Sequence, residues 1–202
     1  MKNLCILFLL MPLISCSAQN IVPYDSDERF FVPNSGDYYK DTNNDFNIYE
    51  GEWKWENSSG DEELIFRLVK ETNTHPDLDF SADLLVGEYK YVANNVELAN
   101  TLGAMNNPNI RGNYHKITGM NIMSKYVKPQ CLECSEDEKR IGLNIEHDDY
   151  YGVNGNLVLR HFVENGLEKL KVTLYDGSWL PDDQNAPEDI DIPFGEYIMI
   201  KQ

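Results

Sequence analysis

The chain has 202 residues and a formal net charge of −17, because 34 acidic side chains outnumber 17 basic ones. This length allows one domain with a substantial core. A nucleic-acid-binding protein would need a stripe of basic residues, and none is visible, so we expect no nucleic-acid partner. Anionic membrane surfaces should repel the chain, so attachment to a membrane would have to come from acyl chains.

The N-terminus has the pattern of an export signal. Lys2 precedes an apolar run from Leu4 to Ile14, which is too short to span a bilayer. The segment that ends in Ser15-Cys16 resembles the lipobox of bacterial lipoproteins, in which the chain is cut just before a Cys that becomes lipid-modified. We therefore predict a signal peptide at residues 1–15, lipidation of Cys16 and anchoring in the cell envelope, at the outer membrane. Ordinary cleavage after Ala18 stays open, and it also predicts export.

Two cysteines, Cys131 and Cys134, remain once Cys5 leaves with the signal peptide and Cys16 is acylated. In an oxidising compartment they are expected to form a small disulfide that closes a turn. Free thiols stay open as an alternative. A zinc site would need two more ligands at a suitable spacing, and a redox pair would have to open a helix after a strand.

Residues 16–45 are predicted to be a tether, because they are polar, rich in Asp and Asn and broken by prolines. Aromatic pairs in its second half suggest that this half packs back on the domain. Its end imitates the ligand spacing of a calcium loop with Asp41, Asn43 and Asp45. Phe46 stands where such a loop needs Gly, so we interpret the stretch as an Asx-rich surface loop.

Residues 47–55 are predicted to be the first barrel strand. Alternation places Tyr49, Gly51, Trp53 and Trp55 on one face and mostly charged residues on the other. Gly51 would let the strand bend sharply, while the indole of Trp53 would plug one end of a closing sheet. The rest of the chain would then be organised around this stretch.

Short apolar segments with turn signals between them continue to the end of the chain. Strands are expected at residues 63–70, 84–92, 96–102, 112–127 (interrupted at Gly119), 141–146, 157–163, 170–174 and 194–201. Asn165-Gly166 makes the strongest hairpin signal, and residues 175–193 are expected to form a long acidic loop. No apolar stripe with helical period runs for three turns. The pattern predicts an all-β, antiparallel up-and-down barrel of about eight strands over residues 46–202, although a sandwich also fits.

These features resemble an uncharacterised family of exported Bacteroidetes lipoproteins with a calycin (lipocalin-like) barrel. The resemblance rests on the signal that ends in Ser15-Cys16, the Gly51-x-Trp53 strand, the meandering hairpins and the terminal strand from Pro193 to Lys201. Lys201 is the only basic residue in that strand, where lipocalins place an Arg that packs over the Trp. The resemblance implies a fold and an export route, and it carries no catalytic residues.

The sequence contains no constellation that identifies an enzyme. None of the four histidines has a second ligand at i+2 or i+4, and no nucleophile elbow, phosphate-binding loop or dinucleotide fingerprint occurs. We expect no metal and no cofactor, and catalysis is less expected than binding.

A small barrel either fills its interior or holds one small apolar ligand. The candidate lining residues share inward-facing positions next to charged neighbours: Tyr49, Trp55, Tyr89, Tyr91 and His161. A small hydrophobic ligand with a polar end is one hypothesis, and simple core packing is the alternative reading of these residues. A second hypothesis is an envelope interaction or structural module that acts through the acidic loop 176–193, with Trp179 as an anchor for a partner protein.

Overall fold

The computed structural model describes residues 19–24, 34–74, 79–181 and 183–202 and, for Ser178 and Trp179, only the main chain. The predicted signal peptide and the lipidation site Cys16 lie outside these ranges. Within them, no helix has the length and apolar character needed to span a membrane.

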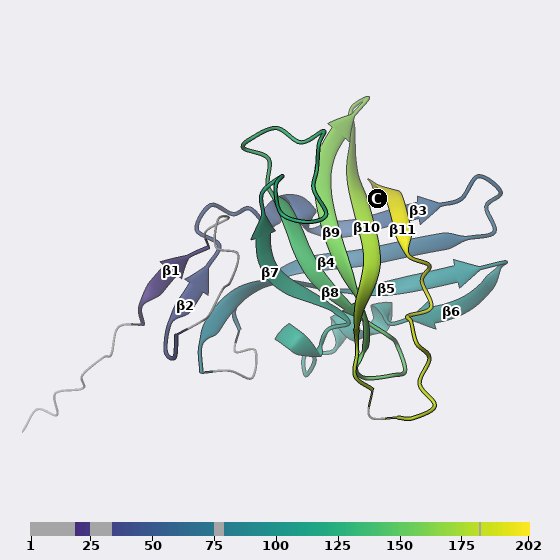
Figure 1. The fold of residues 1–202 in the computed structure, drawn as a ribbon, viewed down its shortest axis with the longest axis horizontal. Coiled ribbons are helices and arrows are strands. Elements are labelled where there is room, and N and C mark those ends of the chain that lie inside the picture. Colours follow the sequence, from purple (N-terminus) through teal and green to yellow (C-terminus); the bar gives the residue numbers. More distant parts are fainter. Residues whose placement is uncertain (1–18, 25–33, 75–78, 182) are drawn as a thin grey trace, which may run out of the picture.

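Strands dominate the described chain, and its helices are short 3-10 turns (Figure 1). The elements are β1 (Ile21–Pro23), β2 (Tyr38–Lys40), η1 (Asn47–Tyr49), β3 (Gly51–Glu56), β4 (Glu63–Thr74), β5 (Ser81–Ala93), β6 (Val96–Asn100), η2 (Leu102–Asn106), η3 (Gly112–Tyr114), β7 (Ile117–Met123), β8 (Arg140–Glu146), β9 (Val153–Glu164), β10 (Leu167–Trp179) and β11 (Gly195–Lys201).

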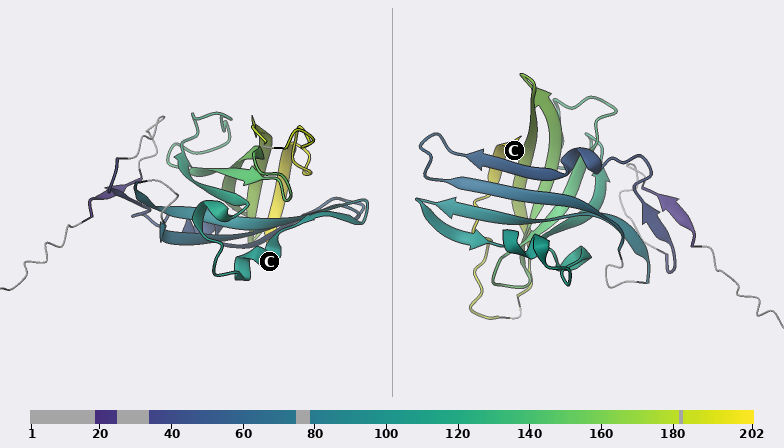
Figure 2. Two further views of the ribbon diagram at one scale, coloured as in Figure 1. Left: turned by 90° about the horizontal axis from the view of Figure 1, so that it is seen from below. Right: turned by 180° about the vertical axis from the view of Figure 1, so that it is seen from behind.

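Eight of these strands form a closed antiparallel barrel in which sequence neighbours pair, so the predicted fold class is confirmed. The order is β3-β4-β5-β7-β8-β9-β10-β11, and two contacts close the ring. β11 pairs with β3 through Lys201 opposite Trp53, and β5 pairs with β7 from Leu85 to Gly87. Figures 1 and 2 show the long strands β4 and β5 crossing behind β8, β9 and β10 at a steep angle.

Period-two alternation explains the core. Every second residue of the barrel strands points inward and is buried, as with Leu64, Phe66 and Leu68 on β4 and Leu170, Val172 and Leu174 on β10. These side chains form one contiguous cluster with the aromatic residues of β3 and β5. An eight-stranded barrel has an interior just wide enough for side chains to fill, which this cluster does over much of its length.

The outer face of β5 is covered as well. All residues from Ser81 to Tyr89 are buried, because β1 and β2 cover one part of the strand and the segment 101–116 covers another. β5 also pairs with three further strands besides β4, namely β2, β6 and β7. A strand buried on both faces needs no polar alternation, which explains its nearly continuous burial.

Two short strands lie within the segment 16–45 that was predicted to be a tether. β1 pairs with β2 and β2 with β5, both in parallel, so these short strands extend the barrel sheet. Tyr39 is buried against Phe80, and the carboxylate of Asp83 accepts hydrogen bonds from the Tyr38 hydroxyl (2.6 Å) and the Asp41 N–H (3.1 Å). Tyr38, Tyr39 and Asp41 thus hold the second half of this segment to the barrel, where the aromatic pair Tyr38-Tyr39 suggested that it packs on the domain.

Two other boundaries differ from the prediction. Tyr49 belongs to η1 and not to a strand, because Phe46 and Tyr49 are both buried and a short 3-10 turn brings them to the same side. β10 continues to Trp179, where it pairs with Val153, so the acidic loop starts later than predicted.

The Asx-rich stretch before η1 is held by Asp41, which accepts hydrogen bonds from Asp45 and Phe46 main-chain N–H groups and pairs with Lys70 at 2.8 Å.

Candidate functional site

Trp53, the residue predicted to plug the barrel, lies in the buried interior cluster. Trp53 is fully buried, its indole N–H donates a hydrogen bond to the Tyr49 carbonyl oxygen (2.8 Å), and the His161 ring meets it edge-on with centroids 6.1 Å apart. Lys201 Nζ lies over the indole, 5.2 Å from its centroid. Gly51 has φ of +127°, and a Cβ there would lie 3.1 Å from Lys201 Cε, so this glycine lets the lysine cross the first strand.

The residues predicted to line a ligand cavity are all part of the packed interior or its edge, but they do not converge on one site. Tyr49 and His161 lie beside the plug, with ring centroids 6.4 Å apart. Tyr89 and Tyr91 are buried further along β5, and Trp55 is half-buried. Trp55 packs edge-on against the Tyr197 ring at 4.9 Å between centroids.

The polar ends of the two most buried tyrosines are used within the fold. The Tyr49 hydroxyl donates to the Lys139 carbonyl oxygen (3.0 Å), and the Tyr89 hydroxyl donates to the Glu146 carbonyl oxygen (3.1 Å). Burial raises the pKa of both hydroxyls well above the ordinary value, so both stay protonated as donors. Burial also lowers the pKa of His161, which favours its neutral form inside the barrel. The two hydroxyls are therefore engaged within the fold, whereas His161 Nε2 is buried and has no hydrogen-bond partner among the described residues.

The acidic loop covers the opposite end of the barrel. Ile190 and Ile192 are buried in the interior cluster. His147 Nε2 lies 3.4 Å from the Asp191 carboxylate, and His147 Nδ1 accepts a hydrogen bond from the Asp149 main-chain N–H (3.0 Å). Part of the loop that was predicted to be an interaction surface therefore packs over this end of the barrel, through Ile190 and Ile192. The side chain of Trp179 lies outside the described part of the structure.

An open pocket lies on the outer face of β4 and β5, beneath the segment 101–116. Its volume is about 420 Å³, and a second hollow of about 280 Å³ adjoins it and shares Arg111 as a wall. Carboxylate, imidazole, guanidinium and amide groups share the first pocket with apolar side chains: Val69, Glu71, Met105, Asn106, Asn107, Pro108, Ile110, Arg111 and His115. Tyr114, which is mostly exposed, lines the second hollow with Asn73 and Asn109.

A buried row of three charged groups forms the floor of this pocket. His115 Nδ1 lies 2.9 Å from the Glu88 carboxylate, and His115 Nε2 lies 3.4 Å from Glu71 Oε1. Glu71 also accepts a hydrogen bond from the Gly112 main-chain N–H at 2.8 Å, which fixes η3 above β4. Glu88 is fully buried, and its Oε2 atom has no hydrogen-bond partner among the described residues.

The two glutamates set the charge of His115. Burial alone would lower the pKa of His115, but the hydrogen bond and charge of Glu88 and the charge of Glu71 raise it above the ordinary value. An imidazolium between two carboxylates donates from both ring nitrogens. The sequence pattern missed this cluster, because Glu88 alternates like a solvent-facing strand residue and His115 lies in a loop far along the chain.

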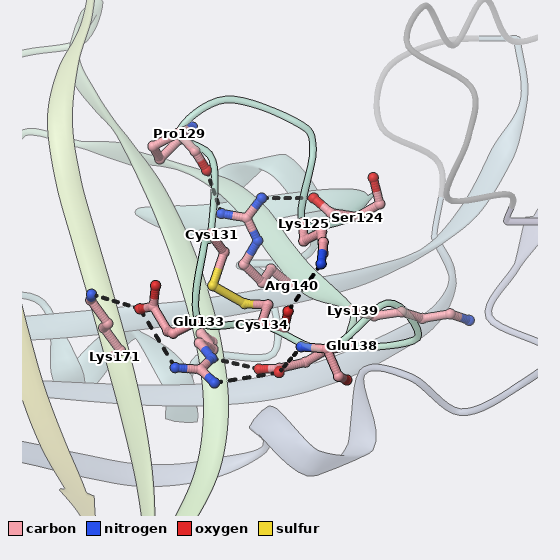
Figure 3. The surroundings of a disulfide bond; sticks show 12 residues. Ser124, Lys125, Pro129, Cys131, Glu133, Cys134, Glu138, Lys139, Arg140 and Lys171 are labelled. Atoms are coloured by element: carbon pink, nitrogen blue, oxygen red, sulfur yellow. Dashed lines mark hydrogen bonds and ion pairs between the residues drawn. A yellow bond between two sulfur atoms is a disulfide. The ribbon is translucent and has the colours of Figure 1, made fainter.

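The predicted disulfide between Cys131 and Cys134 is present, and both cysteines are buried (Figure 3). The disulfide closes a short turn within the loop that joins β7 to β8. Main-chain carbonyl groups of this loop accept hydrogen bonds from the Arg140 guanidinium. Among the residues that the structure describes, no group of three or more His, Cys, Asp and Glu side chains is arranged to hold a metal ion.

No curated protein and no solved structure matches this chain. A family model described as "Family of unknown function (DUF6705)" matches residues 1–202, which is the full length. The chain therefore belongs to this family of unknown function.

Proposed function

We propose that this protein is an exported, lipid-anchored binding protein that takes a small, neutral, hydroxyl-rich ligand of the saccharide class in the pocket over β4 and β5. The observation that carries the proposal is the lining of that pocket. Its volume of about 420 Å³ lies in the range of small-molecule sites, and it combines apolar walls with a few fixed polar groups. The ion pairs of His115 with Glu71 and Glu88 lie directly beneath this open pocket.

The polar groups of the pocket favour a neutral ligand. The lining carries the carboxylate of Glu71 and the cationic His115 and Arg111. The buried Glu88 behind His115 adds a second negative charge, so the charges in and behind the pocket balance. Asn106 and Asn107 add amides that both donate and accept. Neighbouring hydroxyl groups on a ligand also donate and accept, and Tyr114 in the adjoining hollow offers an exposed ring for a sugar face to stack on.

The geometry favours binding over catalysis. Both ring nitrogens of His115 face carboxylates, so neither is free to accept a proton from a ligand. The described lining of the pocket contains no serine or cysteine that could act as a nucleophile beside it. The row instead holds the floor of the pocket rigid, which is what a binding site needs.

A hydrophobic ligand inside the barrel is supported less well. The inward-facing residues Tyr89 and Tyr91 are at most 3% exposed and belong to the packed interior cluster. Entry would require the lid formed by Ile190 and Ile192 to leave that cluster. A partner protein that binds the acidic loop 176–193 would have to contact residues other than Ile190 and Ile192, because these two side chains are buried in the interior cluster.

Lipid anchoring and kinship to the calycin barrels complete the proposal. The lipobox-like segment before Cys16 supports acylation, and the outer membrane is the expected address. The buried Trp53 after Gly51, with Lys201 over its ring, is similar to the Trp–Arg pair of lipocalins, and this similarity supports the kinship. Mass spectrometry of the protein purified from its own host tests the anchor: a diacyl or triacyl mass on Cys16 is expected, and a free N-terminus at Ser17 or later would refute it.

Ligand binding is tested by calorimetric titration with a panel of neutral mono- and disaccharides. Arg111→Ala removes a wall of both hollows, so it should abolish saccharide binding or weaken it at least tenfold. Because Arg111 is exposed, its replacement should not unfold the chain. Arg67→Ala is the matched control, since Arg67 is also on the outer barrel surface but pairs with Glu52 away from the pocket. Equal saccharide affinity in Arg111→Ala and Arg67→Ala, or no binding of any saccharide to the wild type, would refute the proposal.

A further inference from the structure

Glu71 joins the wall of the pocket over β4 and β5 to its floor. One of its carboxylate oxygens accepts a hydrogen bond from the Gly112 main-chain N–H (2.8 Å), and the other lies 3.4 Å from His115 Nε2. On the other side of the imidazole, His115 Nδ1 lies 2.9 Å from the Glu88 carboxylate. The residue that fastens η3 to β4 is therefore itself in contact with a titratable ring.

The two ends of segment 101–116 are held in different ways. At its start, the Thr101 N–H donates to the Tyr89 carbonyl oxygen (2.9 Å), and the Tyr89 N–H donates to the Thr101 hydroxyl (2.9 Å). Main-chain amides and a threonine hydroxyl are not titratable groups. Near its end, the Gly112 N–H meets the carboxylate beside His115. A change in the charge of His115 should therefore act on the end of the segment and leave its start in place.

The charged groups that face the His115 ring come from two strands, Glu71 on β4 and Glu88 on β5. Burial lowers the pKa of His115, but these two carboxylates outweigh burial and raise the pKa above the ordinary value. Arg111, from the same segment, is the other cation in the pocket lining. Lys116 is turned away and donates to a main-chain carbonyl of the loop after β8. β7, which follows, consists of uncharged residues.

Loss of the His115 proton would leave one donor between two acceptors, because a neutral imidazole donates from only one ring nitrogen. Glu88 is fully buried, and its Oε2 atom has no hydrogen-bond partner among the described residues. A buried carboxylate without any partner is costly, so the remaining N–H stays with Glu88. His115 Nε2 then presents a lone pair to Glu71, whose side chain is 16% exposed and can turn to water.

We infer that His115 is a proton switch for this pocket: its protonated form holds Glu71 and η3 in place, and its neutral form releases both. Glu71, Arg111 and His115 line the same pocket, so this release changes the pocket wall. Saccharide would then bind more tightly to the protonated chain, and binding would be accompanied by proton uptake. The part that concerns a saccharide rests on the proposed function, whereas the release of η3 does not.

Pulse-labelling hydrogen exchange tests the switch without a ligand. The full chain is labelled at about pH 6 and about pH 9, on either side of the His115 titration, and each amide's rate is corrected for its intrinsic pH dependence. The protection factor of the Gly112 amide should fall about fivefold or more at the higher pH, whereas that of the Thr101 amide should change less than about twofold. Equal responses of the two amides would overturn the inference.

Two variants assign the response to the contact of His115 with Glu71. In Glu71→Gln, the side-chain amide can donate to the neutral ring, so the protection of Gly112 should no longer depend on pH. His161→Gln is the matched control, because His161 Nε2 also lies near a carboxylate, 3.7 Å from Glu168, but beside Trp53. This control should keep the wild-type response. A wild-type response in Glu71→Gln would refute the assignment; should that variant fail to fold, the comparison of Gly112 with Thr101 in the wild type still decides.

Calorimetric titration with the same neutral mono- and disaccharides separates the switch from the binding proposal. Affinity should be about fivefold or more weaker at about pH 9 than at about pH 6, and the heat should vary with the ionisation enthalpy of the buffer as protons are taken up. Equal affinity at both pH values, with unchanged protection of Gly112, would refute the switch and leave the binding proposal intact. Absence of saccharide binding at both pH values would refute the binding proposal alone, and the Gly112 amide would then decide the switch.

Discussion

Replacement of Asp83 by Ala tests how the N-terminal segment is held to the barrel. Asp83 is 1% exposed, and its carboxylate accepts three hydrogen bonds: from the Tyr38 hydroxyl (2.6 Å), the Asp41 N–H (3.1 Å) and the Asn73 N–H (3.1 Å). The same interaction, after burial itself, raises the pKa of Tyr38 to about 12. One buried side chain thus links β2, the loop after β2 and the end of β4.

The magnitude follows from what each donor can do once the carboxylate is gone. The Asp41 N–H is buried and would stay unpaired, at a cost of about 1–3 kcal/mol. The Tyr38 and Asn73 donors are partly exposed and can turn to water, so each loses only about 0.5–1.5 kcal/mol. The three terms sum to about 2–6 kcal/mol, with a middle value of about 4 kcal/mol, which is a large part of the stability of an ordinary domain.

Urea unfolding and hydrogen exchange should report this loss together. Asp83→Ala should lower the free energy of unfolding by about 4 kcal/mol and increase exchange at the amides of β2, while Tyr38→Phe should cost about 1 kcal/mol. Asp137→Ala is the control, since Asp137 is exposed and its replacement should change stability by less than about 0.5 kcal/mol. If Asp83→Ala were no less stable than this control, residues 38–41 would not be fastened as described.

Three further perturbations have defined outcomes. Folding raises the pKa of His115, so the stabilising contribution of this residue is complete below the ordinary pKa of about 6.5 and is lost as pH rises through the pKa of the folded state. The difference in urea midpoint between wild type and His115→Gln should therefore shrink from about pH 6 to about pH 9. A difference that grows with pH would contradict the ion pairs of His115 with Glu71 and Glu88. Lys201→Ala should cost about 1 kcal/mol and change the fluorescence of Trp53, since Nζ lies 5.2 Å from the indole centroid; an unchanged emission spectrum would argue against that contact. Reduction of the disulfide between Cys131 and Cys134 should lower stability by about 2 kcal/mol, because the closed loop is very short, and a loss above about 4 kcal/mol would mean that the bond supports more than its own loop.

The barrel was predictable because its strands alternate cleanly. The pairing of β9 with β10 follows from Asn165-Gly166, whose main chain has φ of +53° and +78°, as a tight hairpin turn requires. Trp53 was predicted to face inward from the alternation of its strand, and it is fully buried. These are local signals, and a single sequence contains all of them.

The candidate sites could not be predicted in the same way. Glu88 looks like an outward-facing strand residue, and only the passage of segment 101–116 across β5 buries it and brings His115 to 2.9 Å. Arg140 begins a strand, and its partners are main-chain carbonyls that no side-chain pattern reveals. Tyr49 was placed on a strand because alternation continues through it, although the burial of Phe46 requires a 3-10 turn there. In each case a contact distant in sequence or made by the backbone decides the outcome.

The contact of β11 with β3 has a consequence for the order of events in folding. β11 consists of residues 195–201, and β3, with residues 51–56, is the first strand of the ring. The ring can therefore close only after both strands are available, and until then β3 and β10 each present an unsatisfied edge. Removal of β11 should yield a species that associates through these two edges.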